Sequence, residues 1–546
     1  MATDPETTGD DPLGSPKMGL ALSGGGFRAS IFHLGVIRRL EELGLMKDIA
    51  VISAVSGGSI IAAYYVTEME IRLRSKRDEL TKNPDLIDQV RLSVFDSIAT
   101  DFFTALDHNL RSRALVFSPF YHPIGFLKSL RPGYSRSDLM RAEYDYWLYR
   151  NNTLDQLPSV TKSTDNESLY NKAGPKLILN TTSLMTGERR SFSRQPESGL
   201  NDQMTVNGNA LLLSQIVGAS ACVPGLFPPV PVSGELLVDG GVSDNQGIEA
   251  LIENDCDILL VSDASGQMEQ VDRQSSSTAS VVGRTMSILQ FQVRNKLLDL
   301  LIRWRELSGN REFAFIHLFM NLKDRPDVPR VPSEFIPGIA RIRTDLDQFS
   351  FIEREALMYH GYTLIDAQIA TYCPNLKTQS CAATPMGCPR LFSETGPQNG
   401  AVAEKRARIK TVLKAGQQKV FLARSIMKHG LKALLVVILT WLAPLGAFYF
   451  LWANKHIDIL TERIGMPVLG WINGMIPDWV TFLFSEGLGF LNWPITPHGF
   501  TVLLVLGLLT YGLLFLSYLI MRRLARRWDI NQYRTLTGEK PLPPQW

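Results

Sequence analysis

Short apolar runs alternate with glycine-containing turns and helical stretches between residues 18 and about 68. Met18–Leu22 and Ile49–Val55 are typical of buried strands, and Ala29–Leu43 has the length and composition of a helix. Later apolar runs predict three further strands, at Lys176–Leu184, Glu235–Asp239 and Asp257–Ser262. Strands that alternate with helices are characteristic of α/β proteins, so we expect an α/β fold for this part of the chain.

Two long uncharged runs near the C-terminus predict transmembrane helices. Residues 433–453 and 500–521 contain no Asp, Glu, Lys or Arg, and about 20 apolar residues suffice to cross the hydrocarbon core of a bilayer. The alternative is a pair of buried helices in a large soluble core, although such helices are usually shorter. Residues 464–493, between the two runs, are apolar but interrupted by prolines and acids. They indicate an interfacial or re-entrant segment rather than a third crossing.

The basic residues around these runs predict the orientation of the chain. Nine Lys and Arg residues lie between positions 405 and 432, and four Arg residues lie between 522 and 527, whereas acids outnumber bases in the connecting loop. By the positive-inside rule, both termini and the α/β part are expected in the cytoplasm. Residues 1–17 are polar and contain no apolar signal-peptide core. We therefore expect a cell-membrane protein, in the inner membrane if the source is bacterial, with two spans.

Composition excludes several classes of protein. A net charge of +2 over 546 residues gives no indication of nucleic-acid binding, and 45% hydrophobic residues exclude a largely disordered chain. The cysteines are expected to be reduced in the cytoplasm. Cys373, Cys381 and Cys388 have spacings that match no tetrahedral zinc site. We therefore expect neither a metal nor another cofactor.

A glycine turn follows the first predicted strand. Gly24, Gly25 and Gly26 precede a helix, where successive backbone N–H groups and the positive helix end favour an anion or an oxyanion. The alternative is a dinucleotide site, because Gly24, Gly26 and Ala29 also satisfy the GxGxxA pattern. That site requires an acid at the end of the second strand. The second strand ends instead in a serine.

This serine, Ser56, lies in the sequence Ala-Val-Ser-Gly-Gly-Ser between the second strand and the helix-compatible run Ile60–Val66. A strand, a tight turn with small neighbours and a helix form the setting of a nucleophile elbow, which exposes a serine hydroxyl. Ala54 replaces the first glycine of the GxSxG pattern, and its methyl group is tolerated only if the backbone dihedrals remain allowed for a non-glycine residue. The alternative role of Ser56 is a simple helix N-cap.

A serine nucleophile requires a base, and Asp239 is the natural candidate. It ends the strand Glu235–Asp239 and precedes two glycines, and a carboxylate within hydrogen-bond reach can accept a serine proton. Asp-Gly-Gly is also a common turn sequence, which is the alternative. No histidine lies in a comparable strand-end motif, and His33 is expected to pack within its helix. A Ser-Asp dyad is therefore favoured over a Ser-His-Asp triad.

With these motifs the chain resembles the patatin-like phospholipases. The turn with Gly24, Gly25, Gly26 and Arg28 is similar to the oxyanion motif of that family, Ala-Val-Ser-Gly-Gly to its nucleophile elbow, and Asp-Gly-Gly to its catalytic-aspartate motif. A fourth segment, residues 219–229, resembles the ASxAxPxxFxP block. The resemblance covers about residues 18–370 and leaves out the C-terminal spans.

The resemblance implies a three-layer α/β/α sandwich and cleavage of acyl esters without a metal. It further implies that Ser56 is the nucleophile and that Asp239 is the base that activates first the serine and then water. Gly24, Gly25 and Gly26 would donate N–H groups to the oxyanion, with Arg28 reinforcing the positive field.

Together these features predict a membrane-anchored serine lipid acyl hydrolase of the phospholipase or lysophospholipase type. Its expected partners are membrane phospholipids or other acyl lipids; the oligomeric state is left open. The alternative is a lipid-binding membrane scaffold or signalling protein without turnover. The predicted parts are a disordered tail (1–17), a catalytic domain (18–372) with a helical insert at about 69–170, a linker with a basic juxtamembrane segment (373–432), a membrane region (433–521) and a basic tail (522–546).

Overall fold

The computed structural model describes residues 16–107, 134–157, 174–194, 205–206, 209–266, 278–374 except 326, 345, 347 and 348, and then 376, 392 and 400–417. Among the described helices, none combines the length and the apolar character that a membrane crossing requires. The predicted spans 433–453 and 500–521, and the segment 464–493 between them, lie outside the described residues.

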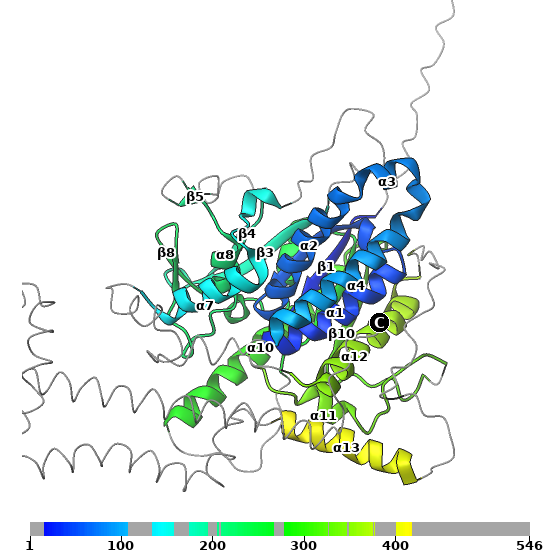
Figure 1. Cartoon of the computed structure of the whole chain (residues 1–546). Helices are drawn as coiled ribbons and strands as arrows, with labels where there is room; N and C mark the ends of the chain where they lie inside the picture. The colour runs from blue at the N-terminus through cyan, green and yellow to red at the C-terminus, as the bar shows by residue number, and fades with distance from the viewer. Residues whose placement is uncertain are drawn as a thin grey trace, which may run out of the picture. The chain divides into compact units, whose positions relative to one another are not determined.

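The centre of the fold is an eight-stranded mixed sheet (Figure 1). Its main path runs β10-β9-β1-β2-β3-β8-β7, and β4 pairs with β3 off this path. The first five strands of the path are parallel to one another, whereas β4 and β8 are antiparallel to β3 and β7 is antiparallel to β8. The strands of this sheet are β1 (Met18–Leu22), β2 (Ile49–Val55), β3 (Lys176–Ser183), β4 (Arg189–Phe192), β7 (Val230–Val232), β8 (Glu235–Asp239), β9 (Ile258–Asp263) and β10 (Glu312–His317).

One feature of this sheet brings distant segments together. Along β3, Asn180 pairs with Val55 at the end of β2, and the next residue, Thr181, pairs with Asp239 of β8. β4 occupies the other side of β3 at both positions. β8 therefore takes over the position beside β3 at which β2 stops, and because β8 is antiparallel to β3, the ends of β2 and β8 meet.

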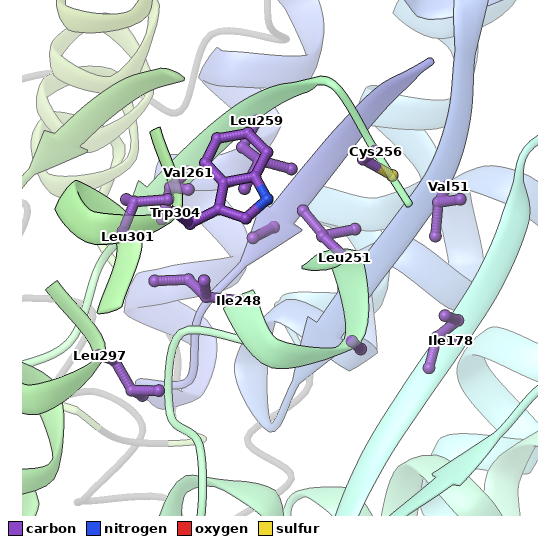
Figure 2. Packing of buried hydrophobic residues seen from close by; sticks show 12 residues of the cluster. Val51, Ile178, Ile248, Leu251, Cys256, Leu259, Val261, Leu297, Leu301 and Trp304 are labelled. Carbon is purple, nitrogen blue, oxygen red and sulfur yellow. The ribbon is translucent and has the colours of Figure 1, made fainter. Parts of the chain in front are cut away.

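Helices pack on both faces of the sheet. One face carries α1 (Gly26–Glu42), α2 (Gly57–Ser75) and, beside α1 and against β10, α12 (Phe351–Tyr372). The other face carries α9 (Ile248–Glu253) and α10 (Thr278–Glu306), where Leu251, Leu301 and Trp304 cover the strands (Figure 2). Further described helices are α3 (Arg77–Lys82), α4 (Ile87–Leu106), α7 (Arg136–Tyr144), α8 (Leu213–Ser220), α11 (Ile336–Ala340) and α13 (Gly400–Gly416).

Two described helices overlap predicted segments. The predicted helix Ile60–Val66 is part of the longer helix α2, which continues to Ser75 and so reaches into the predicted helical segment that begins at about residue 69. The described beginning of the predicted basic segment is helical up to residue 416 and packs on the domain. Helix α13 buries Ile409, Val412 and Leu413, and it packs on α11 and α12.

Charged contacts hold the end of α13 to the domain. The Arg343 N–H donates to the Gly416 carbonyl at 3.0 Å, and the buried Arg343 guanidinium pairs with Glu353 at 2.6 Å. On the surface, Arg406 and Lys410 pair with Glu334 at 3.5 and 2.6 Å. Arg406 and Lys410, which belong to the nine basic residues before the first predicted span, thus pair with the folded domain.

Helices α1 and α12 approach each other closely because each has a glycine at the crossing. A Cβ atom built on Gly35 of α1 would lie 1.8 Å from the Met358 carbonyl oxygen, and one on Gly361 of α12 would lie 2.3 Å from the Phe32 carbonyl oxygen. Both clashes are with backbone atoms, which cannot avoid a clash by a change of rotamer as a side chain can. Only glycine fits at these two positions without separating the helices.

The Gly35→Ala variant is therefore expected to destabilise the fold by about 2–4 kcal/mol, since overpacking a rigid core site forces backbone shifts. Thermal unfolding of the variant and the unsubstituted chain measures the difference. Gly187→Ala is a second variant for comparison. A Cβ at this position would meet nothing within 4 Å, so its effect comes from the positive φ of 76° and not from a clash. Equal unfolding temperatures for Gly35→Ala and the unsubstituted chain would contradict the close packing.

Candidate active site

Ser56 lies in the tight turn between β2 and α2. Its φ of 50° and ψ of −116° are strained for a residue with a side chain. The two residues after Ser56 are glycines because the turn has no room for side chains there. A Cβ on Gly57 would lie 2.1 Å from the Gly26 carbonyl oxygen, and one on Gly58 would lie 2.2 Å from the Leu22 carbonyl oxygen. The Ser56 side chain makes no capping hydrogen bond to α2. This geometry is that of a nucleophile elbow and not that of a simple N-cap.

Ala54 does not disturb this turn. It lies inside β2, paired with Leu22 of β1 and Leu179 of β3, and it is fully buried. It is absent from the described non-glycine residues with positive φ. Its backbone therefore has no need of glycine, which meets the condition that the sequence set for an alanine at this position.

Asp239 reaches Ser56 because β8 ends where β2 ends. Its carboxylate accepts a hydrogen bond from the Gly241 N–H at 2.7 Å, and the Ser56 side chain lies near enough to lower its pKa. Burial raises the pKa of Asp239 to about 6, while the interactions with Ser56 and Gly241 oppose the rise. The group is therefore ionised at neutral pH and becomes protonated in mild acid.

The glycine turn after β1 provides two N–H donors rather than the three predicted. The Gly24 N–H donates to the Asn245 carbonyl at 3.1 Å, so it is not available to an oxyanion. Gly25 and Gly26 have φ values of 141° and 59°, and no acceptor for their N–H groups is found within the described part of the chain. These two N–H groups lie at the N-terminus of α1, where the helix dipole favours negative charge.

Arg28 is near this turn but its guanidinium is already bonded. It donates to the Ile342 carbonyl at 2.8 Å and to the Ala264 carbonyl at 3.0 Å. Burial lowers the pKa of Arg28 to about 10, and the charge of Asp263 opposes that effect. These contacts hold Arg28 in the structure, and its reinforcement of the positive field at the turn stays a prediction.

His33 packs within its helix, as predicted. Its two ring nitrogens lie 2.8 Å from the Ser262 hydroxyl and 2.9 Å from the Ser23 carbonyl. Burial lowers the pKa of His33 to about 4, so the ring is neutral at physiological pH. With both nitrogens engaged away from Ser56, His33 cannot act as its base.

The dinucleotide interpretation of the glycine turn loses its geometric basis. A Cβ on Gly24 would lie 2.4 Å from Oδ1 of Asn245 and 3.1 Å from Cβ of Ser56. The missing side chain at Gly24 therefore makes room for two side chains of this site and not for a pyrophosphate.

Two residues that sequence reasoning did not single out hold the turn that carries Ser56. The Ser56 N–H donates to the Ser220 hydroxyl at 2.9 Å, and that hydroxyl donates to the Asn180 carbonyl at 2.6 Å. The Asn180 side chain donates to the Ala54 carbonyl at 3.1 Å. Ser220 lies in the segment 219–229 noted above, but only the three-dimensional structure shows its contact with the turn.

The Ser220→Ala variant is expected to lower kcat about tenfold with little change in KM, because the buried Ser56 N–H loses its acceptor and the strained turn loosens. Steady-state kinetics on a soluble ester measures both constants. Ser214→Ala is the control: Ser214 lies on the same helix α8, is equally buried, and its hydroxyl has no partner among the described residues. A rise in KM alone would show that Ser220 acts on binding and not on the nucleophile.

The fold and this site define a class of α/β proteins with a serine in a strained turn beside a buried carboxylate. Residues 20–252 match the family model described as patatin-like phospholipase, and this part of the chain is similar to that family. The match is shorter than the predicted 18–370 and ends before α10 and α12.

Among solved structures, VipD from Legionella pneumophila is 15% identical, with a TM-score of 0.28 and coverage of 76% of this chain and 77% of that chain. Human GIVD cytosolic phospholipase A2, in complex with methyl gamma-linolenyl fluorophosphonate inhibitor and terbium chloride, is 14% identical, with a TM-score of 0.40 and coverage of 73% and 60%. TM-scores this low add nothing to the family match.

Proposed function

We propose that this chain is a membrane-anchored serine hydrolase that cleaves the acyl esters of lipids. The family implies lipid acyl hydrolase activity. The observation that carries the finer proposal is the meeting of the strand ends of β2 and β8, which places Ser56 beside the buried Asp239 carboxylate. It joins a nucleophile to a base beside the N–H groups of Gly25 and Gly26.

In the first half of the reaction, the Ser56 oxygen attacks the ester carbonyl carbon while its proton passes to Asp239. The carbonyl oxygen gains the negative charge, which the Gly25 and Gly26 N–H groups and the N-terminus of α1 stabilise. The tetrahedral intermediate then expels the alcohol, which takes the proton from Asp239. The products of this half are the free alcohol and an acyl ester on Ser56.

In the second half, water replaces the alcohol. Asp239 accepts a proton from the water as the water oxygen attacks the acyl carbon. The second tetrahedral intermediate expels the Ser56 oxygen, which recovers a proton from Asp239. A fatty acid leaves and both residues return to their starting states, so the cycle requires neither a metal nor a redox cofactor.

The membrane part of the proposal is supported by the sequence. The uncharged runs 433–453 and 500–521 have the length of spans, and basic residues flank both of them on the outer sides. An anchored enzyme with cytoplasmic termini meets its lipid substrate without a search through solution. The substrates of this proposal are therefore acyl lipids of the cytoplasmic leaflet of the cell membrane.

The test uses the full chain, purified in detergent and incubated with mixed phospholipids in the presence of a chelator. Release of fatty acid and lysolipid is measured, together with labelling by a fluorophosphonate probe. We expect both, because an activated serine reacts with substrate and probe alike. Labelling without release would leave the serine hydrolase intact but exclude these phospholipids as substrates.

Absence of both would favour the second candidate, a lipid-binding scaffold without turnover. Binding of the same phospholipids by a chain that the probe does not label would be its signature.

A further inference from the structure

Helix α10 consists of two halves with different surroundings. From Arg294 onward, Leu297, Leu301 and Trp304 pack in the core against the sheet (Figure 2). The described side chains from 284 to 293 are exposed or half-buried, although many of them are apolar. The exposed large apolar residues of this half are Val281, Val282, Met286, Ile288 and Leu289.

The exposed half lies at the edge of the sheet that carries the candidate active site. Arg294 forms a buried ion pair with Asp263, the last residue of β9, at 2.6 Å. Ser262 of β9 is in register with Leu22 of β1, directly before the glycine turn. From Arg294 the helix runs back along the sheet toward β10, so residues 278–293 extend beyond the active-site edge, over roughly 24 Å. Figure 1 shows α10 extending away from the strands.

The side chains of this half form an amphipathic pattern of one charge sign. Val282, Met286 and Leu289 are four and three residues apart, which places them on one face of the helix, and Val293, one turn further on, packs against the core. Residues 278–293 contain one basic residue, Arg284, and no acid. Apolar side chains with basic neighbours are the composition of helices that lie in the interface of an anionic bilayer.

A second exposed apolar cluster lies at the same edge of the sheet. Leu184 and Met185 follow β3, which is parallel to β2 and continues beyond it. The Leu184 N–H donates to the Leu236 carbonyl at 2.9 Å, which brings Leu236 beside this turn. All three side chains are exposed. Two separate elements thus present apolar side chains beyond the strand ends at which Ser56 and Asp239 lie.

We propose that residues 281–293 of α10 form an interfacial docking helix that lies in the headgroup region of an anionic lipid bilayer and presents the active-site edge to that leaflet. This inference rests on the proposed function. Charge argues against a second copy as the occupant, since residues 278–293 carry Arg284 and no acid that could pair with it in another copy. It argues equally against the regions that flank the predicted spans, which are basic as well.

The functional test compares the double variant Val282→Gln/Leu289→Gln with Ile302→Gln in the full chain, reconstituted in phosphatidylcholine and phosphatidylglycerol vesicles. Ile302 is the matched control because it lies on the same helix with 49% exposure, close to the 57% of Val282 and 55% of Leu289, but in the half beside the core. Hydrolysis of vesicle lipid is measured beside hydrolysis of a soluble short-chain ester.

For the double variant, vesicle hydrolysis is expected to fall at least about tenfold, as two apolar side chains no longer enter the interface, while soluble ester hydrolysis is unchanged. Ile302→Gln is expected to change neither. Vesicle hydrolysis that is equal in the double variant and the unsubstituted chain overturns the docking helix. If the unsubstituted chain hydrolyses neither substrate, the proposed function fails instead, and the docking helix is decided by a second measurement.

That measurement places a photoreactive amino acid at position 289 or 302 and illuminates the reconstituted chain in vesicles that contain a tagged phosphatidylglycerol. A lipid adduct at 289 that is much stronger than at 302 supports the proposal. A cross-link between two copies of the chain, or within the chain, without a lipid adduct at 289 overturns it.

Discussion

The Ser56→Ala variant is expected to lower the hydrolysis of acyl esters by at least about 10³-fold, because the acyl intermediate has no oxygen on which to form. Only the γ-oxygen is lost, and the backbone strain of the turn is carried by alanine as it is by serine. The fold is therefore expected to remain. Initial rates on a soluble ester measure the loss, and thermal unfolding shows that the domain is intact.

Ser59→Ala is the matched control for this variant. Ser59 lies three residues further along in the first turn of α2, is also buried, and its hydroxyl contacts the Ser220 hydroxyl at 2.8 Å rather than Asp239. We expect it to keep activity within about tenfold of the unsubstituted chain. If Ser56→Ala retained the rate of Ser59→Ala, Ser56 would not be the nucleophile.

The local parts of the site could be predicted from sequence, because each depends on residues that are neighbours along the chain. The strands Met18–Leu22, Ile49–Val55 and Glu235–Asp239 have the bounds that their apolar runs predict. The turns after them follow from glycine and serine at strand ends. A sequence pattern thus identifies a turn and a strand end even when it does not show what they contact.

The assembly of these parts depends on long-range pairing that no local pattern records. Beside β3, β2 ends at Asn180 and β8 begins to pair at Thr181. Only the pairing of these two residues shows that β8 takes the place of β2. The same limit applies to the contacts of the glycine turn. The Gly24 N–H is bonded to Asn245, more than two hundred residues away, and the Arg28 guanidinium to Ile342, more than three hundred away.

Asp239→Asn is expected to reduce acyl ester hydrolysis by about 10²–10⁴-fold, since an amide cannot accept the serine proton. In the unsubstituted chain, kcat/KM is expected to rise with pH through an apparent pKa near 6 and then to level off, because the base must be ionised and burial raises the pKa of Asp239 to about 6. The pH profile of kcat/KM on a soluble ester tests this.

A second carboxyl must be separated from Asp239 in that profile. Burial also raises the pKa of Asp244 to about 6, but Asp244 accepts backbone hydrogen bonds from Gln246, Gly247 and Glu249 and not from Ser56. In the Asp244→Asn variant, kcat/KM is expected still to rise with pH through an apparent pKa near 6. Disappearance of the rise in that variant would assign the titration to Asp244.

Stability should respond to Asp239→Asn in the direction opposite to activity. The pKa of Asp239 is raised from 3.8 to about 6 on folding, so the folded state binds the proton more tightly than the unfolded chain. The ionised carboxylate therefore destabilises the fold, with a cost that appears as pH rises from about 4 to 6 and is constant above. At pH 8 the variant should be more stable by about 1–3 kcal/mol, and near pH 4 the difference should vanish. Thermal unfolding at both pH values measures it, and a variant that is less stable at pH 8 would show that Asp239 serves the fold rather than the reaction.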